Sequence, residues 1–305
     1  MTQARDKARP RVSLVLGSGG ARGLAHIGII QWLEAHGYRI ESIAGCSMGA
    51  LVGGVYAAGE LDSYRDWVCA LRQTDVLRFL DLAFQPGGLI KGDRIIDRLR
   101  QMVGDCAIED LPIAYTAVAT DIARQREVWL SKGSLFDAIR ASIAVPTVFT
   151  PHRYLGLTLV DGGLLNPVPI APTFRDLTDI TIAVNLNGDP RDDDDRMPET
   201  PEPTPRDDDL RGRILEFLDG IGNSFKGAHE KGNGDEALGL FELMSRSFET
   251  MQNAIAAMKL AAYAPDVLIE VSRDACEAHE FHRAAELVEI GYRRAEQELT
   301  KRSDQ

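Results

Sequence analysis

Runs of apolar residues alternate along this chain with short glycine-rich turns, and their spacing predicts strands and helices in alternation. The mostly apolar run 12–16 predicts a buried strand that enters a tight turn. Apolar positions then recur at helical spacing over 24–33, and a second short strand is expected over 39–45. The small, apolar stretch 48–58 predicts a buried helix. This order of strand, turn and helix, present twice, favours an α/β fold with a parallel sheet and helices on both faces.

The rest of the chain continues the alternation as far as an acidic stretch and resumes it afterwards. The acidic stretch divides the chain by composition, but the last predicted strand is expected to return to the same sheet, so we predict a single domain over residues 1–305. The further predicted helices cover 61–74, 94–104, 133–145, 238–262 and 278–299, and the further strands cover 113–121, 126–131, 157–161, 179–186 and 266–271.

Charge is concentrated in one segment. The formal net charge of −12 argues against nucleic acid as a partner, because phosphate binding requires clustered lysine and arginine. Residues 189–209 hold ten carboxylates, three arginines and five prolines, a net side-chain charge of −7 from three minus ten. This composition predicts an acidic, disordered loop in solvent.

Cysteine spacing and the length of apolar runs narrow the class of protein further. The four cysteines form no Cys-x-x-Cys pair, so the sequence indicates neither a zinc knuckle, nor a thioredoxin-like site, nor a disulfide scaffold. The apolar run after the basic N-terminus has only five residues, too few for a signal peptide. No run reaches the roughly 18 apolar residues that span a membrane, so a cytoplasmic protein is expected.

The first glycine-rich turn, GSGGARG at Gly17–Gly23, follows the first predicted strand. It fits a dinucleotide-binding turn at Gly17 and Gly19 but has Arg22 where the third glycine belongs, and no Gly-Lys-Ser/Thr completes a phosphate loop. Glycines still allow backbone N–H groups to converge on an anion, such as the oxyanion of acyl transfer. Two interpretations therefore stay open: an anion site, or a tight turn that binds no ligand.

The second turn, GCSMGA at Gly45–Ala50, contains Gly-x-Ser-x-Gly around Ser47. Between a strand and a helix this pattern is typical of a nucleophile elbow, in which Gly45 and Gly49 relieve crowding. A nucleophilic serine needs a base, which in a Ser-Asp-His triad is a late histidine. The sequence thus raises the question of which residue activates Ser47.

None of the six histidines has a context that marks it as this base. Five have a structural or surface explanation: packing in a helix, a helix end, a polar loop, or the start of the closing helix. The sixth, His152, precedes Asp161, the aspartate described next, and so does not fit the Ser-Asp-His order. The histidines are His26, His36, His152, His229, His279 and His282.

Asp161, in LVDGG, ends an apolar strand and precedes two glycines. A carboxylate there is expected at the carboxyl edge of the sheet, where α/β sites collect, and the glycines leave room for a substrate. A carboxylate can act as a general base where its surroundings raise its pKa. The alternative interpretation is a common Asp-Gly turn.

Taken in order, GSGGARG, GCSMG and DGG resemble the patatin-like phospholipase family, particularly its compact bacterial members. IRASIAVPTVFTP before the aspartate and FHRAAELVEIGYRRA near the end are similar to segments of the same family. The resemblance covers a core of residues 12–186 and 234–298 and leaves the acidic loop 189–209 outside the motif set. It implies a three-layer α/β/α fold with a mainly parallel central sheet.

The resemblance also implies roles for individual residues. It makes Ser47 the nucleophile and Asp161 the general base of a Ser–Asp dyad that uses no histidine, metal or organic cofactor. Ser18 departs from the glycine that many members have at this position, which matters little if only neighbouring amides contact the oxyanion. The oxyanion hole falls on the backbone N–H groups of Gly19, Gly20, Ala21 and Arg22.

The implied substrate is a fatty-acyl ester of a phospholipid or lysophospholipid, cleaved through an acyl-enzyme. A soluble esterase or thioesterase with the same dyad is the alternative among enzymes, and a nucleotide-binding or regulatory α/β protein is the alternative outside them. Transient, peripheral contact with the inner face of the membrane is expected. The sequence leaves the formation of homo-oligomers open.

Two further segments each have two interpretations. The apolar stretch 75–84 forms either a lid or acyl channel, or an ordinary buried helix. The basic residues near the N-terminus either attract anionic lipid head groups, by about 1 kcal/mol each, or belong to a solvated tail. These residues are Arg5, Lys7, Arg9 and Arg11.

Overall fold

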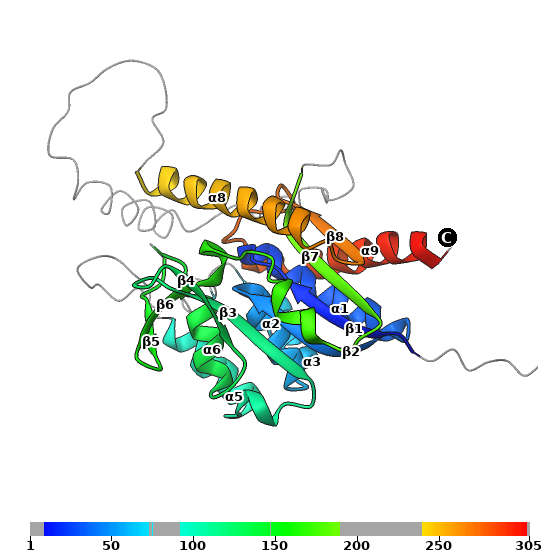
Figure 1. Cartoon of the computed structure of the whole chain (residues 1–305), viewed down its shortest axis with the longest axis horizontal. Helices are drawn as coiled ribbons and strands as arrows, with labels where there is room; N and C mark the ends of the chain where they lie inside the picture. The colour runs from blue at the N-terminus through cyan, green and yellow to red at the C-terminus, as the bar shows by residue number, and fades with distance from the viewer. Residues whose placement is uncertain (1–8, 73–74, 76–91, 147, 190–239, 304–305) are drawn as a thin grey trace, which may run out of the picture.

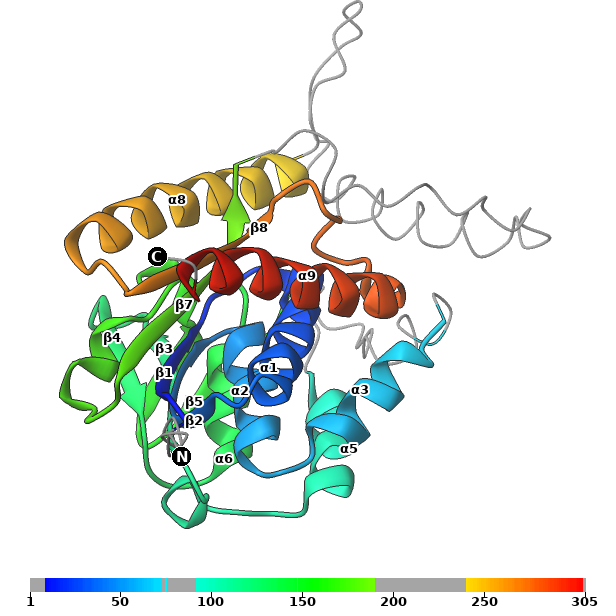
Figure 2. The same cartoon turned by 90° about the vertical axis from the view of Figure 1, so that its right-hand side faces the viewer.

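The computed structural model describes residues 9–72, 75, 92–146, 148–189 and 240–303. Most of the apolar stretch 75–84 and of the acidic loop 189–209 lies outside the described residues, as do Arg5 and Lys7, two of the four basic residues near the N-terminus. Within the described part, an eight-stranded sheet carries helices on both faces (Figure 1, Figure 2).

All the predicted strands and helices of the described part are present, with shifted ends, and the three-residue strand β5 is the strand that the sequence missed. The strands are β1 (Arg11–Leu16), β2 (Arg39–Cys46), β3 (Ala114–Asp121), β4 (Arg126–Leu130), β5 (His152–Tyr154), β6 (Leu157–Asp161), β7 (Ile180–Gly188) and β8 (Val267–Ser272). The α-helices are α1 (Ala25–Ala35), α2 (Met48–Ala57), α3 (Leu61–Cys69), α5 (Asp93–Val103), α6 (Leu135–Ser142), α8 (Leu240–Ala262) and α9 (Ala284–Ser303). Short 3-10 helices are η1 (Gly20–Leu24), η2 (Ile108–Asp110), η3 (Gly162–Leu164), η4 (Ala171–Arg175) and η5 (Phe281–Arg283).

The strand order is β5-β6-β3-β2-β1-β7-β8, with β4 paired to β3. The five strands from β3 to β8 in this order are parallel, because helices return the chain to the same edge between them. At the β3 end of this row, β4 and β6 pair antiparallel with β3, and β5 pairs antiparallel with β6. The predicted return of the last strand is confirmed, since β8 pairs with β7.

Alternate residues of the strands face two separate layers of helices. In β1, Leu14 and Leu16 pack into the larger core with α1, α2, α6 and α9. Val15 points to the opposite face, where Ala183 of β7 and Ala256 of α8 bury it. The chain therefore folds as three layers, α/β/α, with α8 on one face and α9 on the other (Figure 2).

Candidate active site

Ser47 lies at the junction of β2 and α2 and is 4% exposed. Its backbone has φ 54 and ψ −122, a conformation that a residue with a side chain rarely adopts and that costs about 1–3 kcal/mol. The abrupt turn brings α2 against β1, and a Cβ on Gly49 would overlap the carbonyl group of Leu16. The Gly-x-Ser-x-Gly pattern thus corresponds to a strained turn from strand to helix that presents one serine.

Ser142, at the end of α6, holds this turn and was not identified from the sequence. The Ser47 N–H donates to Ser142 Oγ at 2.9 Å, and the Ser142 hydroxyl donates to the Val118 carbonyl of β3 at 2.6 Å. Ser142 is completely buried, so both bonds are shielded from water. The side chain therefore links the strained serine to the central strand of the site.

We expect Ser142→Ala to lower the free energy of unfolding by about 1–3 kcal/mol, because it leaves a buried N–H and a buried carbonyl without their partner. The labelling rate of Ser47 by a fluorophosphonate should fall about tenfold, since a small displacement of a nucleophile has a large effect on rate. Denaturant unfolding and labelling kinetics measure the two effects. Ser131→Ala, at an exposed serine, is the matched control. Unchanged values in Ser142→Ala would contradict the role given to this hydroxyl.

The register of β3 brings the second candidate residue to Ser47. Val118 of β3 pairs with Cys46, the last residue of β2, and the next residue, Ala119, pairs with Asp161, the last residue of β6. The two strand ends therefore meet beside consecutive residues of β3. Because β6 is antiparallel to β3, Asp161 reaches the site from the opposite direction. Asp161 thus lies level with the carboxyl end of the parallel strand β2, at the edge where the sequence placed it, although its own strand runs the other way.

The Asp161 carboxyl is completely buried, with few hydrogen-bond donors around it. Its Oδ1 accepts the Gly163 N–H at 2.7 Å and is 3.9 Å from the thiol of Cys46. Its Oδ2 is buried and has no partner in hydrogen-bond geometry among the described residues. One carboxyl oxygen is thus fixed, and the other can still accept a proton.

Burial raises the pKa of Asp161 from 3.8 to about 6, because the protein interior disfavours the charged carboxylate. Hydrogen bonding from Ser47, the Gly163 N–H and the Cys46 thiol opposes this and keeps the pKa from rising further. Ser47 acts on this pKa although its hydroxyl has not reached full hydrogen-bond geometry with the carboxyl. Such bonds commonly tighten when a substrate binds. At neutral pH the carboxyl is therefore ionised and close to a serine hydroxyl.

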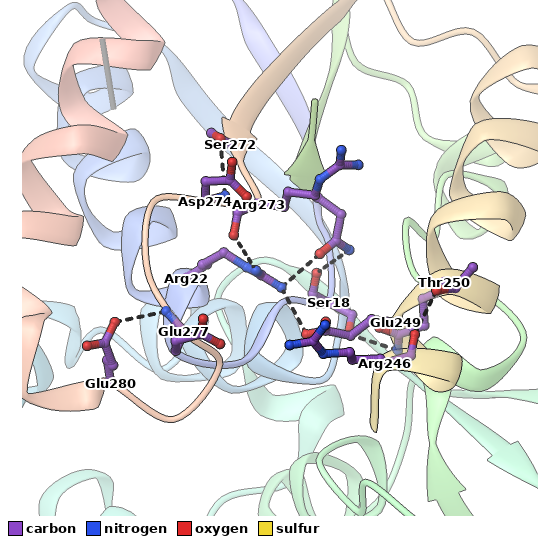
Figure 3. Close-up of polar contacts among 12 residues, drawn as sticks. Ser18, Arg22, Arg246, Glu249, Thr250, Ser272, Arg273, Asp274, Glu277 and Glu280 are labelled. Carbon is purple, nitrogen blue, oxygen red and sulfur yellow. Dashed lines mark hydrogen bonds and ion pairs between the residues drawn. The ribbon is translucent and has the colours of Figure 1, made fainter. Parts of the chain in front are cut away.

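The glycine-rich turn lies at the start of η1 and presents two free amides. No acceptor among the described residues bonds the N–H of Gly19 or Gly20. The Ala21 N–H, in contrast, donates to the Ala278 carbonyl at 2.9 Å. The Arg22 side chain joins a polar network (Figure 3), while its backbone N–H, the fourth predicted donor, stays a prediction. The structure thus leaves Gly19 and Gly20 with free amides and commits the amide of Ala21 elsewhere.

Three of the described histidines, His26, His36 and His152, bond other groups through their rings. His26 is completely buried, and burial lowers its pKa to about 4, so the neutral ring donates through Nε2 to the Gly17 carbonyl at 2.9 Å. His26 therefore stabilises the glycine-rich turn through the carbonyl of its first residue. His152 bonds Asp137 at 3.0 Å, and His229 lies outside the described residues.

The described part of the chain gives no sign of a metal site at the serine and the carboxyl or elsewhere. It contains no group of three or more histidine, cysteine, aspartate or glutamate side chains arranged to hold a metal ion. A cavity of about 320 Å³ opens at the amino-terminal end of β3, where Ser42 and Asp176 line it and neither Ser47 nor Asp161 does. No described helix combines the length and the apolar character needed to cross a membrane.

Comparison with known proteins places these features in a family. The family model for patatin-like phospholipase matches residues 14–174. An uncharacterized NTE family protein of Mycobacterium tuberculosis is 41% identical, over 97% of this chain and 93% of its own length. The lysophospholipase nte1 of Emericella nidulans is 33% identical, over 60% of this chain and 12% of its own length. The solved structure of VipD from Legionella pneumophila aligns with a TM-score of 0.47 and 15% identity, over 96% of this chain and 67% of that one.

The fold and the site define a three-layer α/β/α protein with a strained serine beside a buried carboxyl. The family model covers residues 14–174, more than half of the chain, and the alignment with the mycobacterial relative covers 97% of it. The chain belongs to the patatin-like phospholipase family.

Proposed function

We propose that this protein is a serine acyl hydrolase that cleaves fatty-acyl esters of phospholipids or lysophospholipids through a Ser47–Asp161 dyad. The observation that carries the proposal is the buried Asp161 carboxyl, with a pKa of about 6, beside the strained Ser47. Membership of the patatin-like family and the likeness to the lysophospholipase nte1 of Emericella nidulans support a lipid hydrolase.

In the first step, Asp161 acts as general base. Its Oδ2 takes the proton of the Ser47 hydroxyl as Ser47 Oγ attacks the ester carbonyl carbon. The carbonyl oxygen becomes an oxyanion, which accepts hydrogen bonds from the amides of Gly19 and Gly20. The carbon–oxygen bond to the alcohol then breaks, and Asp161 returns the proton to the leaving alkoxide. An acyl-enzyme on Ser47 remains.

In the second step, Asp161 takes a proton from a water molecule that attacks the acyl carbon. The same two amides stabilise the second oxyanion. Cleavage of the bond to Ser47 Oγ releases the fatty acid, and the proton on Asp161 returns to the serine. No metal or organic cofactor takes part in either step of the proposed reaction.

The proposal includes transient contact with lipid aggregates, because a long-chain ester must leave its bilayer or micelle to reach a buried serine. Exposed apolar side chains on the outer face of α8 support such contact. They are Leu243, Met244, Met251 and Met258.

A substrate panel tests the proposed class of substrate. Fatty-acid release is measured from phosphatidylcholine vesicles, from lysophosphatidylcholine below and above its micelle concentration, and from acyl-coenzyme A, while p-nitrophenyl butyrate reports nitrophenol. We expect kcat/KM for the two lipids to exceed that for the butyrate ester and the thioester, with an increase in rate as lysophosphatidylcholine forms micelles.

Two results would contradict this expectation in different ways. A preference for the butyrate ester or the thioester, with no increase at the micelle concentration, would favour a soluble esterase or thioesterase with the same dyad. Hydrolysis of none of these substrates by the folded protein would remove the proposal of an acyl hydrolase.

A further inference from the structure

Arg22 connects the glycine-rich turn to distant parts of the chain. The side chain is 6% exposed, and its guanidinium donates to the Arg273 carbonyl at 2.7 Å and to Asn187 Oδ1 at 3.0 Å. It also pairs with Glu249 of α8 at 3.6 Å (Figure 3). The Arg22 side chain is thus bound by three elements: the loop after β8, the end of β7 and α8.

Gln252 lies three residues after Glu249 on α8 and contacts the same glycine-rich turn. It is 6% exposed, and its Nε2 donates to Ser18 Oγ at 3.4 Å, directly before Gly19. The same amide fills the space over Gly163, where a Cβ would overlap it. Since the Gly163 N–H donates to Asp161, Gln252 contacts the turn and the loop that carries the base.

The other end of α8 is attached to the loop that follows Asp161. Lys259 pairs with Glu127 of β4 at 2.6 Å, and the second oxygen of Glu127 accepts from Asn166 at 2.9 Å. Asn166 is buried and its N–H donates to the Gly162 carbonyl at 2.8 Å. One helix therefore touches both halves of the site, at contacts that lie on its inner face.

We infer that α8 is a clamp that fixes the amides of Gly19 and Gly20 relative to Ser47, with Glu249 and Gln252 as positioning residues. This inference rests on the proposed acyl transfer, in which those amides bind the oxyanion. Oxyanion donors act through fixed geometry, so small displacements reduce transition-state stabilisation. The family model ends at residue 174, and α8 lies beyond it. The clamp is therefore a property that the matched segment does not contain.

The test compares Gln252→Leu with Thr250→Val in the whole chain. Leucine at 252 keeps most of the packing volume and removes the hydrogen bond to Ser18. Thr250 is exposed on the same helix, and its hydroxyl bonds the Arg246 carbonyl of that helix. We expect Gln252→Leu to lower kcat about tenfold with KM within about twofold, because the displaced amides matter when the oxyanion forms. Thr250→Val should match the wild type.

A second readout separates positioning from a general loss of structure. A trifluoromethyl ketone adds to a nucleophilic serine and carries a tetrahedral oxyanion, so it reports on the donors of Gly19 and Gly20. Its inhibition constant should rise in Gln252→Leu by the factor by which kcat/KM falls. An unchanged kcat, or a loss of kcat/KM with no rise in this constant, would overturn the clamp.

Should Gln252→Leu not fold, Glu249→Gln carries the same comparisons, because the Glu249 side chain is 45% exposed and tolerates substitution. Its ion pair is partly in solvent, so a decrease in kcat of about threefold is expected. Glu296→Gln, at an exposed position of α9, is its matched control. A value of kcat equal to the control would count against the clamp.

Hydrogen exchange distinguishes failure of the clamp from failure of the proposed function. Amides of the segment 17–24 should exchange faster in Gln252→Leu than in wild type, and no activity is needed to see this. If the wild type hydrolyses no ester while this exchange still accelerates, the clamp stands and the proposed function fails. If esters are hydrolysed and exchange in the segment does not change, the clamp fails and the proposed function stands.

Discussion

Replacing Ser47 with alanine is expected to lower kcat for lipid ester hydrolysis by about 10⁴-fold or more. No acyl-enzyme can form without the hydroxyl, and the Gly19 and Gly20 amides then have no covalent intermediate to stabilise. Alanine keeps the Cβ and the Ser47 backbone bond to Ser142, so the fold should persist. Fatty-acid release and fluorophosphonate labelling, located by peptide mass, measure the effect.

The matched control is Ser63→Ala, at an exposed serine of α3. It should retain wild-type hydrolysis and full labelling of Ser47. Denaturant unfolding shows whether Ser47→Ala remains folded, which an inactive variant must be for the comparison to count. Substantial hydrolysis by folded Ser47→Ala would exclude this serine as the nucleophile.

The serine could be predicted from the sequence because its geometry is local. A strand, a Gly-x-Ser-x-Gly turn and a helix follow one another within twenty residues from 39 to 58, and each is marked by its own pattern. Glycines on both sides allow the crowded turn, and the serine itself takes the strained conformation at φ 54. Nothing distant in the chain is needed to recognise this element.

Asp161 was identifiable as a strand end, but its approach to the site was not. The alternation of apolar residues gives the existence of a strand and says nothing about its direction in a sheet. The antiparallel pairing of β6 with β3 arises from the short hairpin with β5, whose three residues from His152 to Tyr154 are too few to show a period. The sequence therefore predicted the residue and its edge of the sheet, but not the direction of the strand that carries it.

Ser142 and Gln252 were missed because their contacts are made only by the folded chain. Ser142 lies 95 residues from Ser47, and Gln252 lies 234 residues from Ser18. Each occupies an ordinary position on a predicted helix, and helical period alone does not distinguish an inward serine or glutamine from any other polar residue. The same reason applies to Ala21, since the acceptor of its amide is the Ala278 carbonyl beyond β8.

The second large effect is expected for Asp161→Asn. Asparagine has nearly the same shape and can still accept the Gly163 N–H, but its amide cannot take a proton from Ser47. We expect kcat to fall by about 10³–10⁴-fold with little change in KM, because proton transfer belongs to the transition state. Steady-state hydrolysis measures this, and Asp110→Asn at an exposed position is the control. Activity near the wild-type value in Asp161→Asn would rule out this base.

The pH dependence of the wild type should show the same carboxyl. Asp161 works as a base only when ionised, and its pKa is about 6. Therefore kcat/KM should fall about tenfold per pH unit well below pH 6 and level off above it. Residual hydrolysis by Asp161→Asn should lack this inflection.

Stability should respond in the opposite sense to activity. The pKa of Asp161 is about 6 in the folded protein and 3.8 in an ordinary peptide, so between these values the unfolded chain loses the proton first and the folded state is penalised as pH rises. A difference of about two pKa units corresponds to a loss of about 3 kcal/mol in the free energy of unfolding. This loss is complete above pH 6 and absent below pH 4. Asp161→Asn should therefore be more stable than wild type at pH 7 by roughly this amount, and nearly equal to it at pH 3.5.

Denaturant unfolding of both proteins across this pH range isolates the contribution of one carboxyl, because the other groups cancel in the difference. An aspartate kept for structure, with its charge paired, would give the opposite sign: its removal would destabilise the protein at neutral pH and matter less in acid. Loss of hydrolysis together with a gain in stability, appearing only as pH rises through the pKa of Asp161, is therefore the combination that distinguishes a buried general base from a structural turn residue.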